Sequence, residues 1–210
     1  MEMVMFDNKV VVLTGATGFL GRNFSKMFVE EGAILVVADI SKHACDDFCV
    51  ELNNIGAEGK AYSFAVDLTD ETSVIEWAKL ILSEFGEVDV LVNNAATKSP
   101  NMFEPLESFP LEDWNLVMGV NITGMFLTCR ELGTSMAYQG KGCIVNLSSI
   151  YGVVAPDQRI YEGSFHEQFG NFSTPAVYSV SKFAVIGLTK YLATYWGGMG
   201  VRSNTLTPGG

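Results

Sequence analysis

Short apolar runs alternate along the chain with longer segments in which apolar residues recur every three or four positions. The short runs are rich in β-branched residues and predict buried strands, at 9–15, 33–39, 61–67, 88–95, 142–149 and 201–210. The longer segments predict helices, at about 20–28, 41–55, 70–85, 111–137 and 176–197. Because strands and helices alternate, we predict right-handed βαβ units in a single α/β domain over 1–210. Its architecture would be a three-layer, doubly wound parallel sheet.

The apolar pattern also predicts the first helix and the start of the second. Leu20, Phe24, Met27 and Phe28 recur at helical spacing after the first strand. Ser41 precedes the second helix, where a serine side chain is a favoured N-cap.

Composition narrows the choice of partners. The chain has 24 acidic and 13 basic residues and a net charge of -11, which argues against a nucleic acid or an anionic membrane surface as partner. The N-terminus lacks the pattern of a signal peptide, and no apolar run approaches the length of a membrane span. With only two histidines, the cysteines make a weak case for a metal, and we predict four reduced thiols in a cytoplasmic protein, Cys45, Cys49, Cys129 and Cys143.

A glycine-rich turn links the first strand to the first helix in the segment TGATGFLG, residues 14–21. Gly15 would permit the tight turn, Gly18 the approach of a pyrophosphate, and Gly21 close packing of the helix on the sheet. The N-terminus of the helix would offer free N–H groups to the phosphates, whereas the alternative is a tight turn without a ligand. We expect the turn to bind a dinucleotide through Gly15, Thr17, Gly18, Phe19, Leu20 and Gly21.

Two acidic residues follow the next two strands. Asp39 lies 24 residues after Gly15, where a carboxylate binds the hydroxyls of the adenine ribose and repels a 2′-phosphate. This favours NAD over NADP, although Asp39 could instead cap the next helix. Asp67 and its neighbour Leu68 are placed to meet the adenine, but a turn or capping role for Asp67 is almost as well supported.

Tyr178 and Lys182 begin the last helix in the segment YSVSK, just after Pro175. Residues four apart share one helix face, so the ammonium would lie close to the phenol. An adjacent positive charge lowers the pKa of a phenol from about 10 by roughly 1–3 units, toward the range where proton transfer is efficient. The alternative is an amphipathic helix start with a surface lysine, and the pair alone does not exclude it.

Other polar residues favour the proton-transfer interpretation of Tyr178 and Lys182, because several of them end neighbouring strands. Asn93 and Asn94 end the fourth strand, Ser148 and Ser149 end the fifth, and Asn121 lies inside a helix that it does not favour. With TGATGFLG, Asp39, NNAA, NLSS, YSVSK and PGG in this order, the chain resembles the short-chain dehydrogenases/reductases, a Rossmann-fold family, over its whole length.

The resemblance implies roles for individual residues. Tyr178 would be the general acid/base, Lys182 would bind the nicotinamide ribose, Ser149 would orient the substrate oxygen, and Asn121 would hold a water in a proton relay. Hydride would pass between NAD(H) and a secondary alcohol or ketone, with a sugar or polyol derivative as a candidate substrate. The remaining cofactor contacts would come from Asn94, Ala95, Tyr178, Pro208 and Gly209.

The chain departs from the compact members of the family at its glycine turn and between its serine and tyrosine. The glycine spacing is TGxxGxxG, which is typical of nucleotide-sugar epimerases and dehydratases and keeps such an enzyme as an alternative. A dinucleotide-binding module without catalysis is a second alternative. Ser149 and Tyr178 are 29 residues apart, which indicates an insertion at about 155–175 that forms either a wall of the substrate pocket or a surface or oligomer contact.

Two further expectations come from the resemblance. The segment from Ser148 to Glu162 resembles dehydrogenases of bacterial surface-sugar pathways, including flagellin glycosylation. Because the chain stops at Gly210, after the PG turn, we expect either a fragment without its C-terminal part or an unusually short enzyme.

The two long helices, 111–137 and 176–197, carry apolar residues on more than one face. Val180, Phe183, Leu188 and Tyr191 cannot all face one sheet. In the family resembled here these helices pair across a two-fold axis, so we predict a homodimer or homotetramer. The alternative is ordinary apolar surface.

Overall fold

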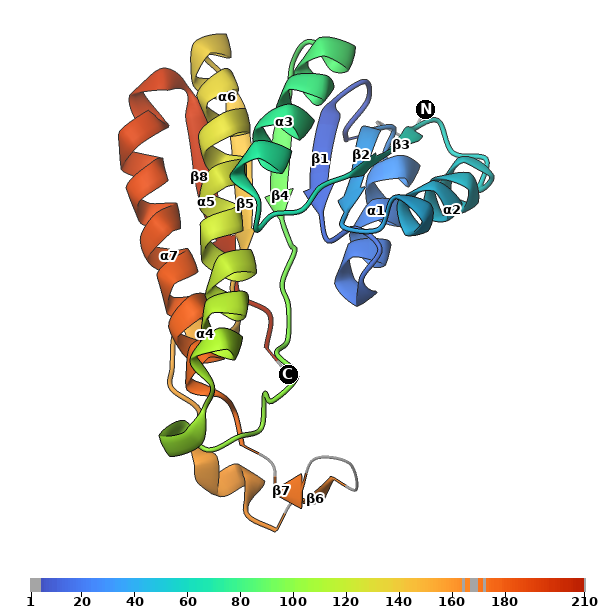
Figure 1. Cartoon of the computed structure of the whole chain (residues 1–210). Coiled ribbons are helices and arrows are strands. Elements are labelled where there is room, and N and C mark those ends of the chain that lie inside the picture. Colours follow the sequence, from blue (N-terminus) through green and yellow to red (C-terminus); the bar gives the residue numbers. More distant parts are fainter. Residues whose placement is uncertain (1–4, 164, 167–169, 172, 210) are drawn as a thin grey trace.

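The computed structural model describes residues 5–163, 165–166, 170–171 and 173–209, and its centre is a six-stranded parallel sheet (Figure 1). The strand order is β3-β2-β1-β4-β5-β8. All six predicted strands are confirmed, as β1 (Val10–Thr14), β2 (Ile34–Asp39), β3 (Lys60–Ala65), β4 (Val90–Asn93), β5 (Gly142–Leu147) and β8 (Val201–Leu206).

Helices cover the sheet in two groups, which gives the three layers of the prediction. One group is α1 (Phe19–Glu30) and α2 (Lys42–Asn53), which pack on one face (Figure 1). The other face is covered by α3 (Glu71–Phe85), by the helical rod of α4 (Leu111–Met118), α5 (Met125–Thr128) and α6 (Thr134–Gln139), and by α7 (Ala176–Trp196). Ser41 caps α2 as predicted, because its hydroxyl accepts the Ala44 N–H at 3.3 Å.

The register of the strands brings their polar ends to one edge. Thr14 is paired with Asn93, Asn93 with Asn146, and Asn146 with Thr205. The strand order reverses between β1 and β4, and ligands of doubly wound sheets bind at such a switch point, beyond the carboxyl ends of the strands. The fold therefore places the polar strand ends where a site is expected.

The buried face of α1 does not follow its large apolar residues. Leu20 and Met27 are each 41% exposed, whereas Gly21, Ser25 and Phe28 are buried against the sheet. A Cβ on Gly21 would lie 2.1 Å from the Gly15 carbonyl oxygen, so the helix can approach the sheet this closely only along a small-residue face. Apolar spacing alone could not show this.

The predicted helix 111–137 is a continuous rod, but it is not uniformly α-helical. Two π-helical segments interrupt it, Gly119–Gly124 and Cys129–Gly133. Asn121 lies in the first of them, in agreement with its poor fit to an α-helix. Widened turns of this kind are frequent at functional sites.

The insertion lies beyond the carboxyl edge of the sheet, at the bottom of Figure 1. It contains a 3₁₀ turn, Gln158–Tyr161, and a short antiparallel pair, β6 (Phe165–His166) and β7 (Gly170–Asn171). Residues 164, 167–169 and 172 of the insertion lie outside the described residues, as does Gly210. Within the part of the chain that is described, no helix is long and apolar enough to cross a membrane.

Candidate active site

The glycine turn has the geometry that close approach of a ligand requires. Gly15 has φ +63°, and a Cβ there would lie 2.7 Å from the Ala95 Cα. Gly18 is the N-cap of α1, and no side chain of a described residue caps this helix. The first N–H groups of α1 therefore remain available to a phosphate, and a Cβ on Gly18 would meet only the Gly15 carbonyl oxygen, at 3.4 Å. The turn fits the pyrophosphate of a dinucleotide, with the exposed side chains of Phe19 and Leu20 beside it.

Asn94 and Ala95, the two residues that follow β4, are hydrogen-bonded to the first strand end and its glycine turn. They therefore lie beside the turn, where a contact with the cofactor is predicted. The Asn94 side-chain amide donates to the carbonyl oxygens of Thr14 at 3.1 Å and Gly15 at 2.9 Å. The backbone N–H groups of Asn94 and Ala95 both lie 3.2 Å from the Thr14 hydroxyl. The buried Thr14, which the sequence reasoning did not single out, thus joins the two loops that flank the switch point.

Asp39 lies at the end of β2 and faces the glycine turn. One carboxylate oxygen accepts the Thr17 N–H at 3.1 Å and the Thr17 hydroxyl at 2.6 Å, and the other accepts the Ile40 N–H at 2.8 Å. Because Ser41 caps α2, the alternative role of Asp39 as a helix cap is wrong. A partly exposed carboxylate at this edge retains lone pairs for the hydroxyls of a ribose.

Asp67 lies two residues beyond the end of β3. Its Oδ1 accepts both the N–H and the hydroxyl of Thr69, at 2.8 and 2.7 Å. Asp67 therefore closes a turn, which is the alternative to the predicted contact with an adenine. The Leu68 side chain is buried, and a Cβ on Gly124 of the helical rod would lie 2.7 Å from the Leu68 Cβ. The turn therefore supports the loop, and contact of Asp67 or Leu68 with an adenine stays a prediction.

Lys182 is a buried cation, only 5% exposed. Its Nζ donates to the Leu147 carbonyl oxygen at 2.9 Å and lies 5.8 Å from the centre of the Tyr178 ring. No carboxylate of the described residues forms an ion pair with it. Burial lowers the pKa of Lys182 to about 8, and the side chain is therefore largely protonated at neutral pH.

Ser148 and Ser149 have different roles at the end of β5. The Ser148 hydroxyl donates to the Lys182 carbonyl oxygen at 2.8 Å, which ties the strand to α7. The Ser149 hydroxyl accepts the Tyr151 N–H at 3.3 Å at the start of the turn Ile150–Gly152, and no described residue accepts its proton. Ser149 can therefore donate a hydrogen bond to a substrate oxygen.

The last predicted cofactor residues lie beside this turn. The Ile150 N–H donates to the Pro208 carbonyl oxygen at 3.0 Å, and the Ser148 N–H donates to that of Leu206 at 2.8 Å. The segment that carries Pro208 and Gly209 therefore follows the same edge of the sheet as Ser149.

Asn121 is buried and bridges the loop after β4 to α7. Its carbonyl oxygen accepts the Thr97 N–H at 3.0 Å, and its amide donates to the Ser181 hydroxyl at 3.2 Å. Ser181 in turn donates to the backbone oxygen of Tyr178 at 2.8 Å. The four predicted catalytic residues thus come from two helices and one strand end that are joined by hydrogen bonds.

A buried polar network beneath these residues was not predicted. The Asn93 amide donates to the Asn146 Oδ1 at 2.8 Å, the Thr128 hydroxyl donates to the Asn93 Oδ1 at 2.7 Å, and the Asn146 amide donates to the Thr189 hydroxyl at 2.9 Å. All four residues are at most 5% exposed, and each hydrogen bond joins a different pair of elements. The network holds β4, β5, α5 and α7 in one register, which rigidifies the site above it.

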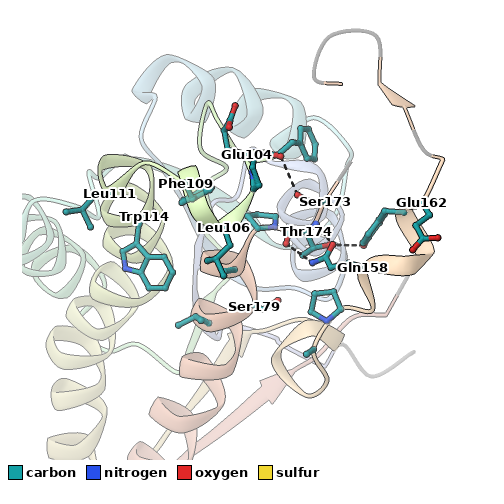
Figure 2. Close-up of a pocket in the computed structure, with 18 of the residues that line it drawn as sticks. Glu104, Leu106, Phe109, Leu111, Trp114, Gln158, Glu162, Ser173, Thr174 and Ser179 are labelled. Atoms are coloured by element: carbon teal, nitrogen blue, oxygen red, sulfur yellow. Dashed lines mark hydrogen bonds between the residues drawn. The ribbon is translucent and has the colours of Figure 1, made fainter. Parts of the chain in front are cut away.

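Two cavities open beside Tyr178 and the insertion. The smaller, about 210 Å³, is lined by Tyr178, Tyr151, Thr174 and the loop after β4. The larger, about 1100 Å³, lies between the insertion and the starts of α4 and α7. Figure 2 shows Leu111 and Trp114 on one side of it and Glu162 on the other.

The cysteines show no sign of a metal or redox site. All four are free thiols, and burial raises the pKa of Cys45 to about 11 and of Cys49 and Cys129 to about 12. Among the described residues, no group of three acidic, histidine or cysteine side chains could hold a metal ion.

Comparison with known proteins matches nearly the whole chain. A family model described as short chain dehydrogenase matches residues 9–210. The D-threitol dehydrogenase of Mycolicibacterium smegmatis is 34% identical over 202 residues, which cover 96% of this chain and 70% of that protein.

Solved structures agree in fold. A xylitol dehydrogenase with bound NAD+ has a TM-score of 0.82 and 30% identity, over 98% of this chain and 71% of that one. A gluconate 5-dehydrogenase from Burkholderia cenocepacia J2315, in complex with NADP and tartrate, has a TM-score of 0.83 and 25% identity, over 99% of this chain and 73% of that one. The resemblance to surface-sugar dehydrogenases stays a prediction.

Proposed function

The chain belongs to the short-chain dehydrogenase family, whose members are NAD(P)-dependent oxidoreductases acting on CH–OH groups, and from this premise we propose that it interconverts a secondary alcohol and a ketone. The observation that carries the proposal is the buried Lys182, whose Nζ lies 5.8 Å from the centre of the Tyr178 ring and donates to the Leu147 carbonyl oxygen at the end of β5, the strand that leads to Ser149. Similar proteins named for threitol, xylitol and gluconate favour a small polyol or sugar derivative as the substrate.

The proposed reaction combines hydride transfer, for which a cofactor is needed, with proton transfer by Tyr178. A nicotinamide dinucleotide held by the glycine turn and Asp39 would supply the hydride acceptor for oxidation, or the hydride donor for reduction, at the carbinol carbon. In oxidation, the Tyr178 phenolate takes the hydroxyl proton, and in reduction the phenol returns a proton to the carbonyl oxygen. Ser149 donates to that oxygen, and the Lys182 ammonium stabilises the phenolate. Asn121 hydrogen-bonds to Ser181 of α7, the helix that carries Tyr178 and Lys182.

The test of this function is hydride transfer itself. Purified protein should oxidise secondary alcohols of a polyol panel with NAD+, which is measured as NADH absorbance. Absence of turnover with every alcohol and every matching ketone would contradict the proposal and favour a non-catalytic dinucleotide-binding module.

The epimerase or dehydratase alternative is not favoured, because the protein and structures similar to this chain are named as dehydrogenases. Such enzymes use a tightly retained NAD catalytically. We therefore expect purified protein to carry far less than one dinucleotide per chain, which is measured by release and quantification after denaturation. Stoichiometric retention would support the alternative.

We further propose NAD as the preferred nicotinamide dinucleotide, because the Asp39 carboxylate would repel a 2′-phosphate. Wild-type protein should bind NADH at least about tenfold more tightly than NADPH, since one unfavourable charge contact costs about 1.4 kcal/mol or more. Asp39→Ser should remove most of this ratio in fluorescence titrations. Asp47→Ser is the matched control, because Asp47 is an exposed acid on α2 and should leave the ratio unchanged. Equal affinities in the wild type would contradict the assignment.

We also propose a homodimer or homotetramer that buries the outer face of α7. Val180, Phe183, Tyr191 and Tyr195 are 44–62% exposed along this helix, whereas Leu188 packs partly against the core. Large apolar groups aligned on one face indicate an interaction surface.

Replacing Phe183 and Tyr191 together with Glu should convert the oligomer to a monomer, because paired copies would then bury unpaired carboxylates. The molar mass in solution, measured by light scattering after size exclusion, checks this. Val50→Glu is the control, since Val50 is 62% exposed on α2, on the opposite side of the sheet. A monomeric wild type, or an unchanged mass in the double variant, would contradict the interface.

The four free cysteines support a reducing compartment, and we propose the cytoplasm as the site of action.

A further inference from the structure

Three hydroxyl groups form a hydrogen-bonded chain between the two cavities beside Tyr178. The Thr174 hydroxyl donates to the Tyr161 phenol oxygen at 2.8 Å, and the phenol oxygens of Tyr161 and Tyr151 lie 2.8 Å apart. Tyr151 and Thr174 line the smaller cavity together with Tyr178, whereas Tyr161 and Thr174 line the larger one. The chain therefore begins in the insertion and ends at the candidate substrate cavity.

The insertion holds this chain in place through a second pair of contacts. The Gln158 side chain donates to the Thr174 carbonyl oxygen at 3.1 Å and accepts the Thr174 N–H at 3.2 Å (Figure 2). Thr174 thus cannot rotate freely at the backbone, and its hydroxyl is aimed at Tyr161. The wall between the two cavities is consequently a set of polar groups in fixed positions.

Tyr151 is fixed from the opposite side by the serine turn. Its N–H donates to the Ser149 hydroxyl at 3.3 Å, so the Tyr151 backbone moves with the group that orients the substrate oxygen. The pKa of Tyr151 is raised, first by the hydrogen bond with Tyr161 and, among smaller causes, by the nearby Tyr178 phenol. Tyr151 therefore stays protonated at neutral pH and close to the acid/base.

The Tyr161–Tyr151 contact leaves a hydrogen-bonding position on Tyr151 for a ligand in either direction. Either phenol can donate in this pair. If Tyr161 donates, Tyr151 keeps its proton for a ligand, and if Tyr151 donates, its oxygen keeps a lone pair that can accept a hydrogen bond. A hydroxyl group of a ligand can both donate and accept, so it can pair with Tyr151 in both cases.

We propose that Tyr151 is a specificity-determining residue, whose phenol forms a hydrogen bond with a second hydroxyl group of the substrate. The preferred substrates would then be small diols and hydroxyketones rather than mono-alcohols with the same carbon skeleton. This inference rests on the proposed function, because it assigns a substrate class to the same site.

The shape of the smaller cavity supports this substrate class. Its volume of about 210 Å³ is below the ≈300–1,000 Å³ of sites for drug-sized ligands, so it suits a small molecule. Met102, Phe103, Val117 and Val177 make much of its wall apolar, and water is displaced when a substrate fills it. A mono-alcohol cannot form this second hydrogen bond, and one hydrogen bond contributes about 0.5–1.5 kcal/mol.

The other polar side chains that line this cavity are Thr97, Lys98, Ser99, Ser173 and Thr174, and the Ser99 hydroxyl is buried without a partner among the described residues. The Thr97 hydroxyl is already engaged, since it donates to the Lys98 carbonyl oxygen at 3.3 Å, and Lys98 is exposed. Tyr151 lies before the insertion, and its contact with Tyr161 is what the insertion adds to this cavity beside Tyr178.

Matched substrate pairs test the proposal in the intact protein with NAD+. The pairs are 2-butanol with meso-2,3-butanediol, and cyclohexanol with cyclohexane-1,2-diol. Wild type should prefer each diol, and Tyr151→Phe should lower kcat/KM about tenfold for the diols and less than twofold for the mono-alcohols. Tyr161→Phe should lower kcat/KM for the diols less, about threefold, because Tyr151 keeps its phenol but loses its orienting partner. Tyr138→Phe, at a tyrosine that is 85% exposed at the end of α6, should change neither.

The outcomes separate this inference from the proposed function. Equal losses on diol and mono-alcohol, no loss in Tyr151→Phe, or no diol preference in the wild type would overturn the role of Tyr151 and leave the dehydrogenase intact. A wild type that oxidises none of the four alcohols, and none of the polyol panel, would overturn the proposed function and this inference with it. A thermal unfolding midpoint of Tyr151→Phe within a few degrees of the wild type shows that the variant is folded.

Discussion

A Tyr178→Phe enzyme will turn over secondary alcohols about 10²–10⁴-fold more slowly than the wild type, which is the usual contribution of a positioned general acid/base. It should bind NADH with unchanged affinity, because the glycine turn and Asp39 are untouched. The phenol hydroxyl of Tyr178 forms no hydrogen bond with a described residue, so its removal should not lower the free energy of unfolding. A loss of activity without a loss of stability is the signature of a group reserved for the substrate.

The measurement is kcat and KM by NADH absorbance on the best alcohol of the panel, with NADH affinity by fluorescence and stability by urea unfolding. Tyr138→Phe is the matched control, because it removes a phenol oxygen at an exposed position remote from the sheet edge. A Tyr178→Phe enzyme that keeps its kcat within threefold of the wild type would remove Tyr178 from the proton-transfer step.

The order of layers was predictable, because it depends on local periodicity and on the handedness of βαβ units. Every predicted strand is present, and the predicted cap of Ser41 is confirmed by its hydrogen bond. Local periodicity does not identify the buried face of α1, where Gly21 and Ser25 rather than Leu20 and Met27 are buried. Contact between a helix and a sheet is decided by how closely the two backbones approach, and a count of apolar positions does not contain that distance.

The site was predictable to the extent that its residues end strands or share a helix face. Asn94, Ser149 and Lys182 could be placed at one edge because parallel strands end together. The network of Asn93, Asn146, Thr128 and Thr189 could not, because each residue lies in a different apolar element and only the packed fold makes them neighbours.

Tyr151 could not be assigned for a related reason. Its role depends on Tyr161 and Thr174, which reach it through the path of the insertion. The one local signal is its position, two residues after Ser149, and this spacing alone does not separate a pocket residue from a turn residue.

Burying the charge of Lys182 lowers the free energy of unfolding of the protein. Its folded-state pKa is about 8, against an ordinary value of 10.5. A difference of 10.5 − 8 units corresponds to about 3 kcal/mol of destabilisation at pH values below 8, where both the folded and unfolded states are protonated. Such a cost is typical of a residue kept for function, since proteins break local rules at their sites.

Replacing Lys182 with Met should therefore raise the free energy of unfolding at pH 7 by about 2 kcal/mol. The gain is smaller than the full 3 kcal/mol because the Leu147 carbonyl oxygen loses its donor, which costs about 1 kcal/mol. Turnover should fall at the same time by about 10²-fold or more, because the phenolate of Tyr178 loses its neighbouring cation.

The difference in the free energy of unfolding between the Lys182→Met protein and the wild type should decrease as the pH rises from 8 to 10.5. Between pH 8 and 10.5 the folded wild type has lost the Lys182 proton while the unfolded chain retains it, so the wild type gains stability as the pH rises. Urea unfolding of both proteins from pH 6.5 to 10 measures the difference, in which the contributions of the buried cysteines cancel. The exposed Lys190, replaced with Met, is the control and should give a difference independent of pH. A Lys182→Met protein that is less stable than the wild type at pH 7, by more than the lost hydrogen bond explains, would show that the buried ammonium is a net stabilising group.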